Sequence, residues 1–286
     1  MTQPQLLGAR RLREVLARHG VRPTKKLGQN FVVDPNTIRK VLAVADLHPE
    51  DSVLEVGAGA GSLTLGLAGR ARKVVAVECD PRLVGVLSEV LEGAGNVEVV
   101  EADALRLDLG PIDAGKLVAN LPYNIATPLV LRALEQAPGI SHLTVMVQKE
   151  VGQRWAAGPG SKVYGRVSVM VAYWTEAGVV GEVSRRAFWP VPSVDSVIVR
   201  LVRRPAPSEV DRRALFAVVK SAFSQRRKSL RAALAPLAGS PALAEDLCGD
   251  AGVASTARAE DTTLEEFVSL ASSLVAAGVE PGGPVA

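Results

Sequence analysis

The stretch Asn120-Leu121-Pro122-Tyr123 combines residue types that could hold a planar ligand: a side-chain amide, a rigid proline and an aromatic ring. It follows the apolar run 116–119, which predicts a buried strand. It precedes Thr127-Pro128, which predicts a helix start with Thr127 as N-cap and Pro128 at the first helical position. We therefore expect it at a strand-to-helix turn, where open α/β sheets bind their ligands. The same residues would also fit a turn that Asn120 caps and in which Tyr123 packs.

A glycine-rich loop lies nearer the N-terminus. Gly57, Gly59 and Gly61 stand between an expected strand, 52–56, and an expected helix, 62–68. Glycines at these positions let the backbone turn tightly and approach a ligand that a side chain would exclude. Glu78 ends the next expected strand. A carboxylate there can accept hydrogen bonds from both hydroxyls of a ribose.

Two cofactors that contain adenosine would suit this loop and acid. A nicotinamide dinucleotide fold prefers the spacing Gly-x-Gly-x-x-Gly, whereas here the third glycine comes one residue early and Ser62 stands in its place. That fold also gives no reason for Asp103 or Asn120 at the ends of later apolar runs. The spacing therefore favours S-adenosylmethionine.

The elements that must position these residues alternate between strands and helices. Expected strands lie at 52–56, 73–77, 97–100, 116–119, 142–147 and 197–202. Asp34-Pro35 and Asp80-Pro81 predict helix starts, because each is followed by apolar residues at helical spacing. This alternation, with a polar residue at each strand's carboxyl end, predicts an α/β fold with a doubly wound parallel sheet and a ligand across its switch point.

Composition limits the class of protein. The 286 residues predict about two domains, and the linker-like run 203–207 divides them into residues 1–204 and 205–286. No apolar run approaches the ~20 residues that cross a bilayer. The Arg-rich helix expected at 5–20 lacks the apolar centre of a signal peptide. The two distant cysteines, Cys79 and Cys248, predict a cytoplasmic protein without disulfides or a metal site.

Charge is unevenly distributed along the chain. Residues 1–30 hold seven basic residues and one acidic, residues 181–235 hold twelve and four, and residues 236–286 hold one and eight. The two basic blocks could form a phosphate-binding surface if they adjoin in space, and solvated helix faces are the other explanation.

The C-terminal part has a helical composition, and we expect a small all-α domain whose first helix Ser208 caps. A compact cationic cluster lies within it, formed by Arg226, Arg227, Lys228 and Arg231. Such a cluster would bind phosphates and so position RNA without reading its sequence.

The residues above belong to longer motifs. These are Lys26-Leu-Gly-Gln-Asn-Phe31, Glu55-Val-Gly-Ala-Gly-Ala-Gly61, Glu78-x-Asp80, Asp103-Ala104, Asn120-Leu-Pro-Tyr-Asn-Ile-Ala-Thr-Pro128, Phe188-x-Pro-x-Pro-Ser-Val-Asp-Ser196 and Phe223-Ser-Gln-Arg-Arg-Lys-Ser-Leu-Arg231. Together they resemble the ribosomal RNA adenine dimethyltransferase family, and the last motif favours its small-subunit branch. Val32 departs from the pattern, because many relatives have Leu there.

The resemblance implies a Rossmann-like class I methyltransferase sheet and a role for each matching residue. The residues that would bind S-adenosylmethionine are Asn30, Val32, Gly57, Glu78, Asp103, Ala104 and Asn120. Val32 would act through its backbone, Glu78 would hold the ribose, and Asp103 would accept from the adenine amino group. The catalytic residues would be Asn120, Leu121, Pro122, Tyr123 and Phe188.

The implied reaction is methyl transfer to N6 of adenine. The N6 lone pair is delocalised into the ring, so this amine is a poor nucleophile, while a sulfonium methyl group is a strong electrophile. If the Asn120 side-chain oxygen and the Leu121 carbonyl accept the N6 hydrogens, the nitrogen is drawn toward tetrahedral geometry and its lone pair points at the methyl group. Tyr123 and Phe188 would sandwich a base taken out of its stack.

The resemblance also implies a substrate and a partner. The target would be two adjacent adenines in a hairpin loop of small-subunit rRNA, and we expect a monomer that acts on the small ribosomal subunit during its biogenesis. A resistance-type dimethyltransferase of large-subunit RNA would share the catalytic motifs. A non-catalytic RNA-binding assembly or transcription factor on the same fold is a further alternative, against which the intact Asn120 and Glu78 speak.

Overall fold

The computed structural model describes residues 6–24, 28–205 and 210–280, and its internal contacts divide the chain into two units. The first unit comprises residues 1–152 and 177–203, and the second comprises residues 153–176 and 204–286. Segment 153–176, which the sequence analysis assigned to the first domain, groups with the C-terminal helices. Lys26 and the expected cap Ser208 lie outside the described residues.

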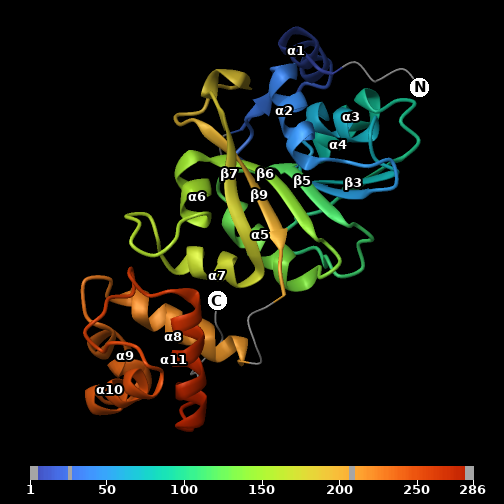
Figure 1. Ribbon diagram of the computed structural model, residues 1–286. Coiled ribbons are helices and arrows are strands. Elements are labelled where there is room, and N and C mark those ends of the chain that lie inside the picture. Colours follow the sequence, from blue (N-terminus) through green and yellow to red (C-terminus); the bar gives the residue numbers. More distant parts are fainter. Residues whose placement is uncertain (1–5, 25–27, 206–209, 281–286) are drawn as a thin grey trace. The chain divides into compact units, whose positions relative to one another are not determined.

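A seven-stranded sheet forms the centre of the first unit (Figure 1). Its strands are β2 (Ser52–Val56), β3 (Lys73–Glu78), β4 (Val97–Glu101), β5 (Lys116–Asn120), β6 (His142–Gln148), β7 (Thr175–Val183) and β9 (Ser196–Arg203), in the order β4-β3-β2-β5-β6-β9-β7. The pairs from β4 to β6 are parallel, and β9 is antiparallel to β6. The predicted doubly wound α/β fold is confirmed, with an antiparallel strand added beside the parallel ones.

The strand order reverses at β2, because β3 and β4 lie on one side of it and β5 and β6 on the other. Right-handed crossovers therefore place α3 (Ser62–Ala68) and α4 (Pro81–Val90) on one face of the sheet and α5 (Ala126–Gln136) on the other. On the first face α2 (Pro35–Ala45) packs beside α3, and Leu42 and Leu63 share a buried cluster with Val53. The carboxyl ends of β2 and β5 thus flank a switch point.

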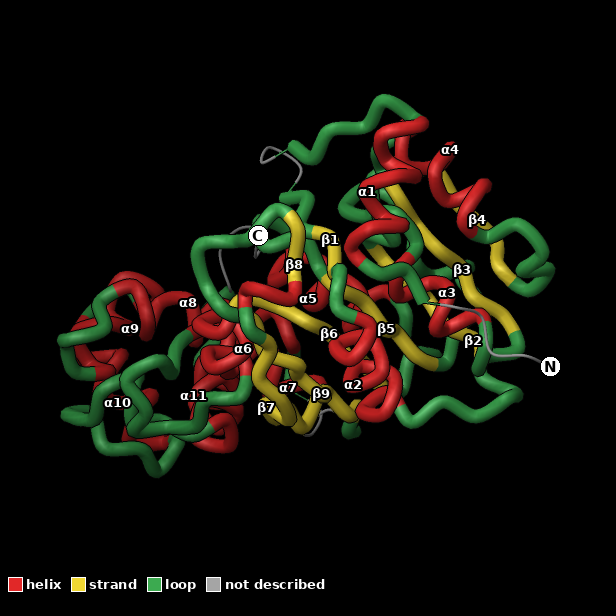
Figure 2. Tube along the Cα trace, turned by 90° about the horizontal axis from the view of Figure 1, so that it is seen from above, coloured by secondary structure: helices red, strands yellow, loops and turns green. Residues whose placement is uncertain are grey.

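A short ribbon joins two segments that are far apart in the sequence. β1 (Phe31–Val32) pairs antiparallel with β8 (Phe188–Trp189), which follows a 3₁₀ turn at Arg185–Ala187. Figure 2 shows the two strands side by side. The preceding helix, α1 (Ala9–Arg18), is shorter than the expected 5–20, and it buries Leu12 and Leu16 in a cluster that also contains Phe31.

Helix starts follow the expected caps in two places and depart from them in one. Asp34 and Asp80 each accept amide hydrogens at the start of a helix whose first residue is proline, as predicted. The prediction that Thr127 caps α5 is wrong, because the helix begins at Ala126 with Ile125 as N-cap. Proline is tolerated throughout the first turn, where amides have no intrahelical acceptor, so Pro128 marks the turn and not the first residue.

The second unit is helical. Its helices are α7 (Arg166–Trp174), α8 (Arg212–Ser224), α9 (Leu230–Ala238), α10 (Pro241–Asp250) and α11 (Leu264–Ala276), while α6 (Lys149–Trp155) spans the division between the units. Phe267 is fully buried at its core, with the Phe223 ring 5.9 Å from it and the Tyr164 ring 5.8 Å from Phe223. The C-terminal helices agree with the predicted all-α part. Within the described ranges, none of the helices has the length and apolar character that a membrane span requires.

Candidate active site

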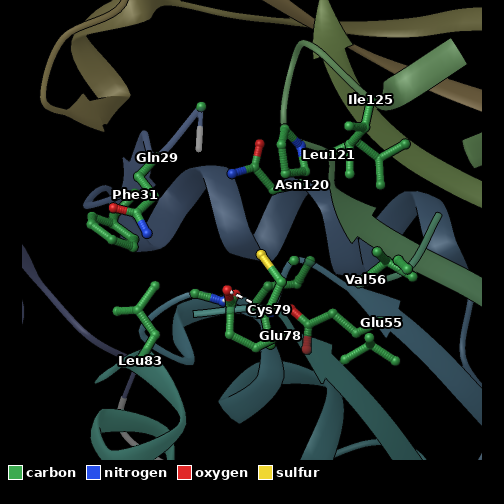
Figure 3. A pocket seen from close by; sticks show the side chains of 18 of the residues that line it. Gln29, Phe31, Glu55, Val56, Glu78, Cys79, Leu83, Asn120, Leu121 and Ile125 are labelled. Atoms are coloured by element: carbon green, nitrogen blue, oxygen red, sulfur yellow. Dashed lines mark hydrogen bonds between the residues drawn. The ribbon is translucent and has the colours of Figure 1, made fainter. Parts of the chain in front are cut away.

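A cleft of roughly 880 Å³, counting its open mouth, lies at the carboxyl ends of β2, β3 and β5. Its walls come from the glycine loop after β2, the ends of β3 and β5, the loop after β4 and the segment around β1 (Figure 3). The predicted site residues that line it are Asn30, Val32, Gly57, Glu78, Asp103, Ala104, Asn120, Leu121, Pro122 and Tyr123.

Gly57 brings the glycine loop against the Asn120–Tyr123 stretch. Its φ angle is 73°, and its amide donates to the Val77 carbonyl at 2.9 Å. A Cβ atom at this position would lie 3.1 Å from Cδ of Pro122, which is closer than ordinary packing allows. The absence of a side chain therefore lets two walls of the cleft touch.

Glu78 organises the loop from the end of β3. The side chain is 6% exposed, and its Oε1 accepts from the amides of Cys79 and Asp80, both at 2.9 Å. Its Oε2 accepts from the Gly59 amide at 2.8 Å. A carboxylate has about four acceptor positions, so the group retains capacity for one further donor from the cleft.

The floor of the cleft contains a buried carboxyl group that the sequence analysis did not assign. Glu55 is 1% exposed, and burial, together with the nearby charge of Glu78, raises its pKa to about 8. Glu55 Oε2 and Ser62 Oγ are buried without a hydrogen-bond partner in the described part of the chain. Because buried polar atoms are normally paired, these two fit a polar ligand group at the floor. Their positions at the start of the glycine motif and directly after its end were visible in the sequence, but their burial was not.

Asp103 stands in the loop after β4. Its Oδ1 accepts from the Leu105 amide at 2.9 Å, and its Oδ2 lies 3.6 Å from Nε of Arg106. The loop is held to the end of β3 by a hydrogen bond of 3.0 Å from the Ala102 amide to the Glu78 carbonyl. The half-exposed carboxylate can therefore accept a further hydrogen bond from a ligand in the cleft.

Asn120 is the last residue of β5, and a hydrogen bond fixes the orientation of its side-chain amide. Its Nδ2 donates to the Asn30 carbonyl at 3.3 Å, and Asn30 in turn donates from Nδ2 to the Gly28 carbonyl at 3.2 Å. With the nitrogen directed to the backbone beside β1, the side-chain oxygen of Asn120 remains available as an acceptor. The amide of Leu121 continues the pairing with β6 by donating to the Met146 carbonyl at 3.1 Å.

A hydrogen bond holds the hydroxyl group of Tyr123. Its hydroxyl lies 2.9 Å from Oγ of Ser196, a fully buried residue of β9, and burial raises the pKa of the phenol. Ser196 was visible only as the last residue of a motif, and no local pattern indicates that it pairs with Tyr123.

Phe188 does not share this cleft. It is 2% exposed and packs in a buried cluster with Val32 and Ile38, so the structure does not bring it opposite Tyr123. The next residue, Trp189, is only partly buried.

Gln29 is a further lining residue that the sequence analysis did not assign. It accepts from the Thr24 amide at 2.8 Å and donates to Oδ2 of Asp80 at 3.0 Å. This pair of bonds fixes the segment before β1 to the start of α4. Charge gives no signal for such a role, because glutamine is neutral.

The predicted RNA-binding cations of the second unit differ in their partners. Arg226 lies 3.0 Å from Glu260 and also donates to the Lys162 carbonyl at 2.7 Å, and Arg231 lies 3.2 Å from Glu245. Arg227 and Lys228 are exposed, and neither has an acidic partner among the residues that the structure describes. In the same described ranges, His, Cys, Asp and Glu form no group of three placed to hold a metal.

Comparison with known proteins places this geometry in context. Residues 21–275 match the family described as Ribosomal RNA adenine dimethylase. The chain is 48% identical over 280 residues to a protein of Leifsonia xyli subsp. xyli named Ribosomal RNA small subunit methyltransferase A, a match that covers 95% of this chain and all of that protein.

Two solved structures are similar as well. A dimethyladenosine transferase from Plasmodium falciparum superposes with a TM-score of 0.76 at 26% identity, covering 86% of this chain and 98% of that one. The 23S rRNA methyltransferase ErmE superposes with a TM-score of 0.67 at 33% identity, covering 86% of this chain and all of that one.

Proposed function

The chain belongs to the ribosomal RNA adenine dimethylase family, and on that premise we propose that it transfers two methyl groups from S-adenosylmethionine to N6 of each of two adjacent adenines in small-subunit rRNA. The observation that carries the proposal is that Asn120, Glu78 and the glycine loop meet in one cleft at the switch point. The small-subunit substrate is supported by the 48% identity to a relative named for that activity.

The cleft has the features that this cofactor requires. S-adenosylmethionine would supply an electrophilic methyl group. The contact between Gly57 and Pro122 forms a cradle that a side chain would fill, and the unpartnered Glu55 and Ser62 oxygens suit a polar group at the floor. Glu78 would accept from the ribose and Asp103 from the adenine amino group, while Asn30, Val32 and Ala104 complete the wall.

Asn120 and Leu121 would prepare the attacking amine. The Asn120 nitrogen donates to Asn30, so the oxygen faces away from that bond and can accept one N6 hydrogen. The Leu121 carbonyl would accept the other. Two acceptors on one nitrogen favour a pyramidal geometry with a localised lone pair, which is the geometry of the transition state and not of the planar ground state. Pro122 restricts the backbone that carries both acceptors.

Tyr123 would stack on the extruded base, with its ring held by Ser196. After methyl transfer the nitrogen is cationic and its proton can pass to water, so the site needs no strong general base. Phe188 would have to leave its buried position to stack on the other face, and this part of the proposal has no support from the described contacts.

The second unit would position the RNA through its phosphates. Arg227 and Lys228 are exposed and free of acidic partners within the described residues, so they are the stronger candidates. Arg226 and Arg231 could contribute only by exchanging Glu260 and Glu245 for phosphate. We propose that the protein acts as a monomer in the cytoplasm.

The test is to incubate the protein with methyl-labelled S-adenosylmethionine and with separated small and large ribosomal subunits that lack the modification. Digestion and mass analysis should find dimethyladenine in small-subunit rRNA only, and Asn120→Ala should abolish it. Label in large-subunit rRNA alone would favour the activity for which ErmE is named. Absence of label with full RNA binding would favour a non-catalytic binding factor.

A further inference from the structure

Two residues of the cleft wall, Asp103 and Ala104, come from a segment without a helix or strand. Residues 102–115 connect β4 with β5 and contain neither kind of element. In the sheet β3 and β2 lie between these two strands, and a parallel crossover of this kind is usually made by a helix. The segment therefore depends on contacts with other elements to hold Asp103 at the cleft.

Asp103 begins a single helical turn, residues 103–107, which we name the Asp103 turn. The amides of Arg106 and Leu107 both donate to the Asp103 carbonyl at 2.9 Å, and the Asp103 side chain caps the turn by accepting from the Leu105 amide. The last carbonyls of a helix have no acceptor role within it, because no later amide follows them. A helix of one turn is also unstable by itself.

Arg132 of α5 donates to these carbonyls. Its Nη2 donates to the Leu107 carbonyl at 2.7 Å, and its Nη1 donates to the Leu105 carbonyl. Its Nε donates to Oε1 of Gln136, one turn further along α5, at 3.0 Å. All three guanidinium nitrogens are therefore engaged, two with the Asp103 turn and one with the helix, and the planar fork has a fixed orientation.

Helix α5 is a rigid support for this side chain. Leu129, Val130 and Ala133 are buried on its inner face, and its N-cap, Ile125, lines the cleft. A right-handed crossover from β4 to β5 places the connecting segment on the face of the sheet that α5 covers. Arg132 thus ties the wall that carries Asp103 to the helix that follows the Asn120–Tyr123 stretch.

We propose that Arg132 is a positioning residue for S-adenosylmethionine, because it holds the Asp103 turn in the shape that presents Asp103 and Ala104 to the cofactor. Arg132 itself does not line the cleft, so it acts through the turn. The inference rests on the proposed function and adds to it a residue that the cofactor does not touch. Without this tether the turn would be formed only part of the time, and the apparent Kd would rise as the formed fraction falls.

The test measures Kd for S-adenosylmethionine by calorimetry on the full chain with Arg132→Met, which removes the donors and keeps an unbranched side chain. Arg203→Met is the matched control. Arg203 also donates to backbone carbonyls near the end of α5, and these lie outside the cleft lining. Melting temperatures of both variants show whether a change of affinity merely follows a change of stability.

Arg132→Met should raise the Kd about tenfold, which corresponds to a turn formed about one tenth of the time. In the cofactor-free protein the amides of Arg106 and Leu107 should exchange with solvent about tenfold faster, because the turn opens more often. Arg203→Met should leave both quantities at their wild-type values. Arg132→Lys, which can still donate to one carbonyl, should raise the Kd about threefold, and it replaces the methionine variant if that protein does not fold.

A double variant shows whether Arg132 acts through Asp103. If it does, Asp103→Asn and Arg132→Met together should raise the Kd about twentyfold and not by the hundredfold product of two independent losses. The inference would be overturned by wild-type affinity in both Arg132 variants, by an equal loss in Arg203→Met, or by losses that multiply. A wild-type protein that binds S-adenosylmethionine but does not methylate small-subunit rRNA would refute the proposed function instead, and the calorimetry would still decide the role of Arg132.

Discussion

The substitution Gly57→Ala tests whether the contact between the glycine loop and the Asn120–Tyr123 stretch is needed for methyl transfer. Gly57 has a φ angle of 73°, and an added Cβ would lie 3.1 Å from Cδ of Pro122. Gly93 provides a matched control, because its φ angle is 84° and an added Cβ would meet no atom within 4 Å. Both variants place an alanine in a left-handed backbone conformation, but only in Gly57→Ala does the new Cβ come too close to Pro122.

The two effects can be separated in size. A left-handed conformation costs an alanine about 1–2 kcal/mol, so both variants should lose that much unfolding free energy. In Gly57→Ala the ring of Pro122 must also move by a few tenths of an ångström. Because misplacement by about 1 Å can cost a hundredfold in rate, we expect kcat/KM to fall roughly tenfold, or about 1.4 kcal/mol in the barrier.

The assay combines denaturant unfolding with initial rates of methylation on small-subunit rRNA. We predict matched losses of stability in the two variants and a loss of kcat/KM in Gly57→Ala alone. Wild-type rates in both variants would show that the contact with Pro122 has no part in the chemistry. Equal loss of rate in both would assign the defect to stability.

Three further predictions follow from the site. Ser196→Ala removes the partner of the Tyr123 hydroxyl and should lower kcat/KM for RNA about fivefold to tenfold while cofactor affinity stays unchanged; Tyr123→Phe should match it, and wild-type rates in both would remove this hydrogen bond from the account. The pKa of Glu55 is raised to about 8, against 4.5 for an ordinary glutamate. The protonated side chain therefore contributes fully to the stability of the folded protein below about pH 4.5, and this contribution is lost as the pH rises through about 8. The free energy of unfolding, measured by denaturant titration, should therefore fall between pH 5 and 8 by at most about 1.4 kcal/mol per pH unit, and Glu55→Gln should flatten this dependence. A wild-type free energy of unfolding that does not change over this range would contradict the burial argument. Asp103→Asn should weaken binding of S-adenosylmethionine about tenfold by calorimetry, and unaltered affinity would exclude Asp103 from the site.

Much of the fold and of the cleft lining could be predicted from the sequence, because the signals are local. Buried parallel strands appear as short apolar runs, and a proline after Asp34 or Asp80 marks a helix start. Once the strands are parallel, geometry brings their carboxyl ends to one edge, so Glu78 and Asn120 had to lie close to one cleft.

The rest depended on partners that are distant in the sequence. Phe188 carries the same aromatic signal whether it faces a substrate or the core, and only the pairing of two-residue strands β1 and β8 places it among buried side chains. A basic cluster likewise does not reveal its counter-charges, and Glu260, which pairs with Arg226, lies in another part of the second unit. Ser196 lies within hydrogen-bond distance of Tyr123 because β9 pairs with β6, and this pairing joins strands that are distant in the sequence.

The most direct test is the single-turnover rate of methyl transfer by Asn120→Ala, measured with S-adenosylmethionine and small-subunit rRNA both saturating. If Asn120 accepts a hydrogen from N6 in the transition state, the rate should fall at least about a hundredfold, the loss typical of one transition-state hydrogen bond, while cofactor affinity changes only a few-fold. A rate within about threefold of wild type would contradict the account, because it would show that the amine reacts without this acceptor.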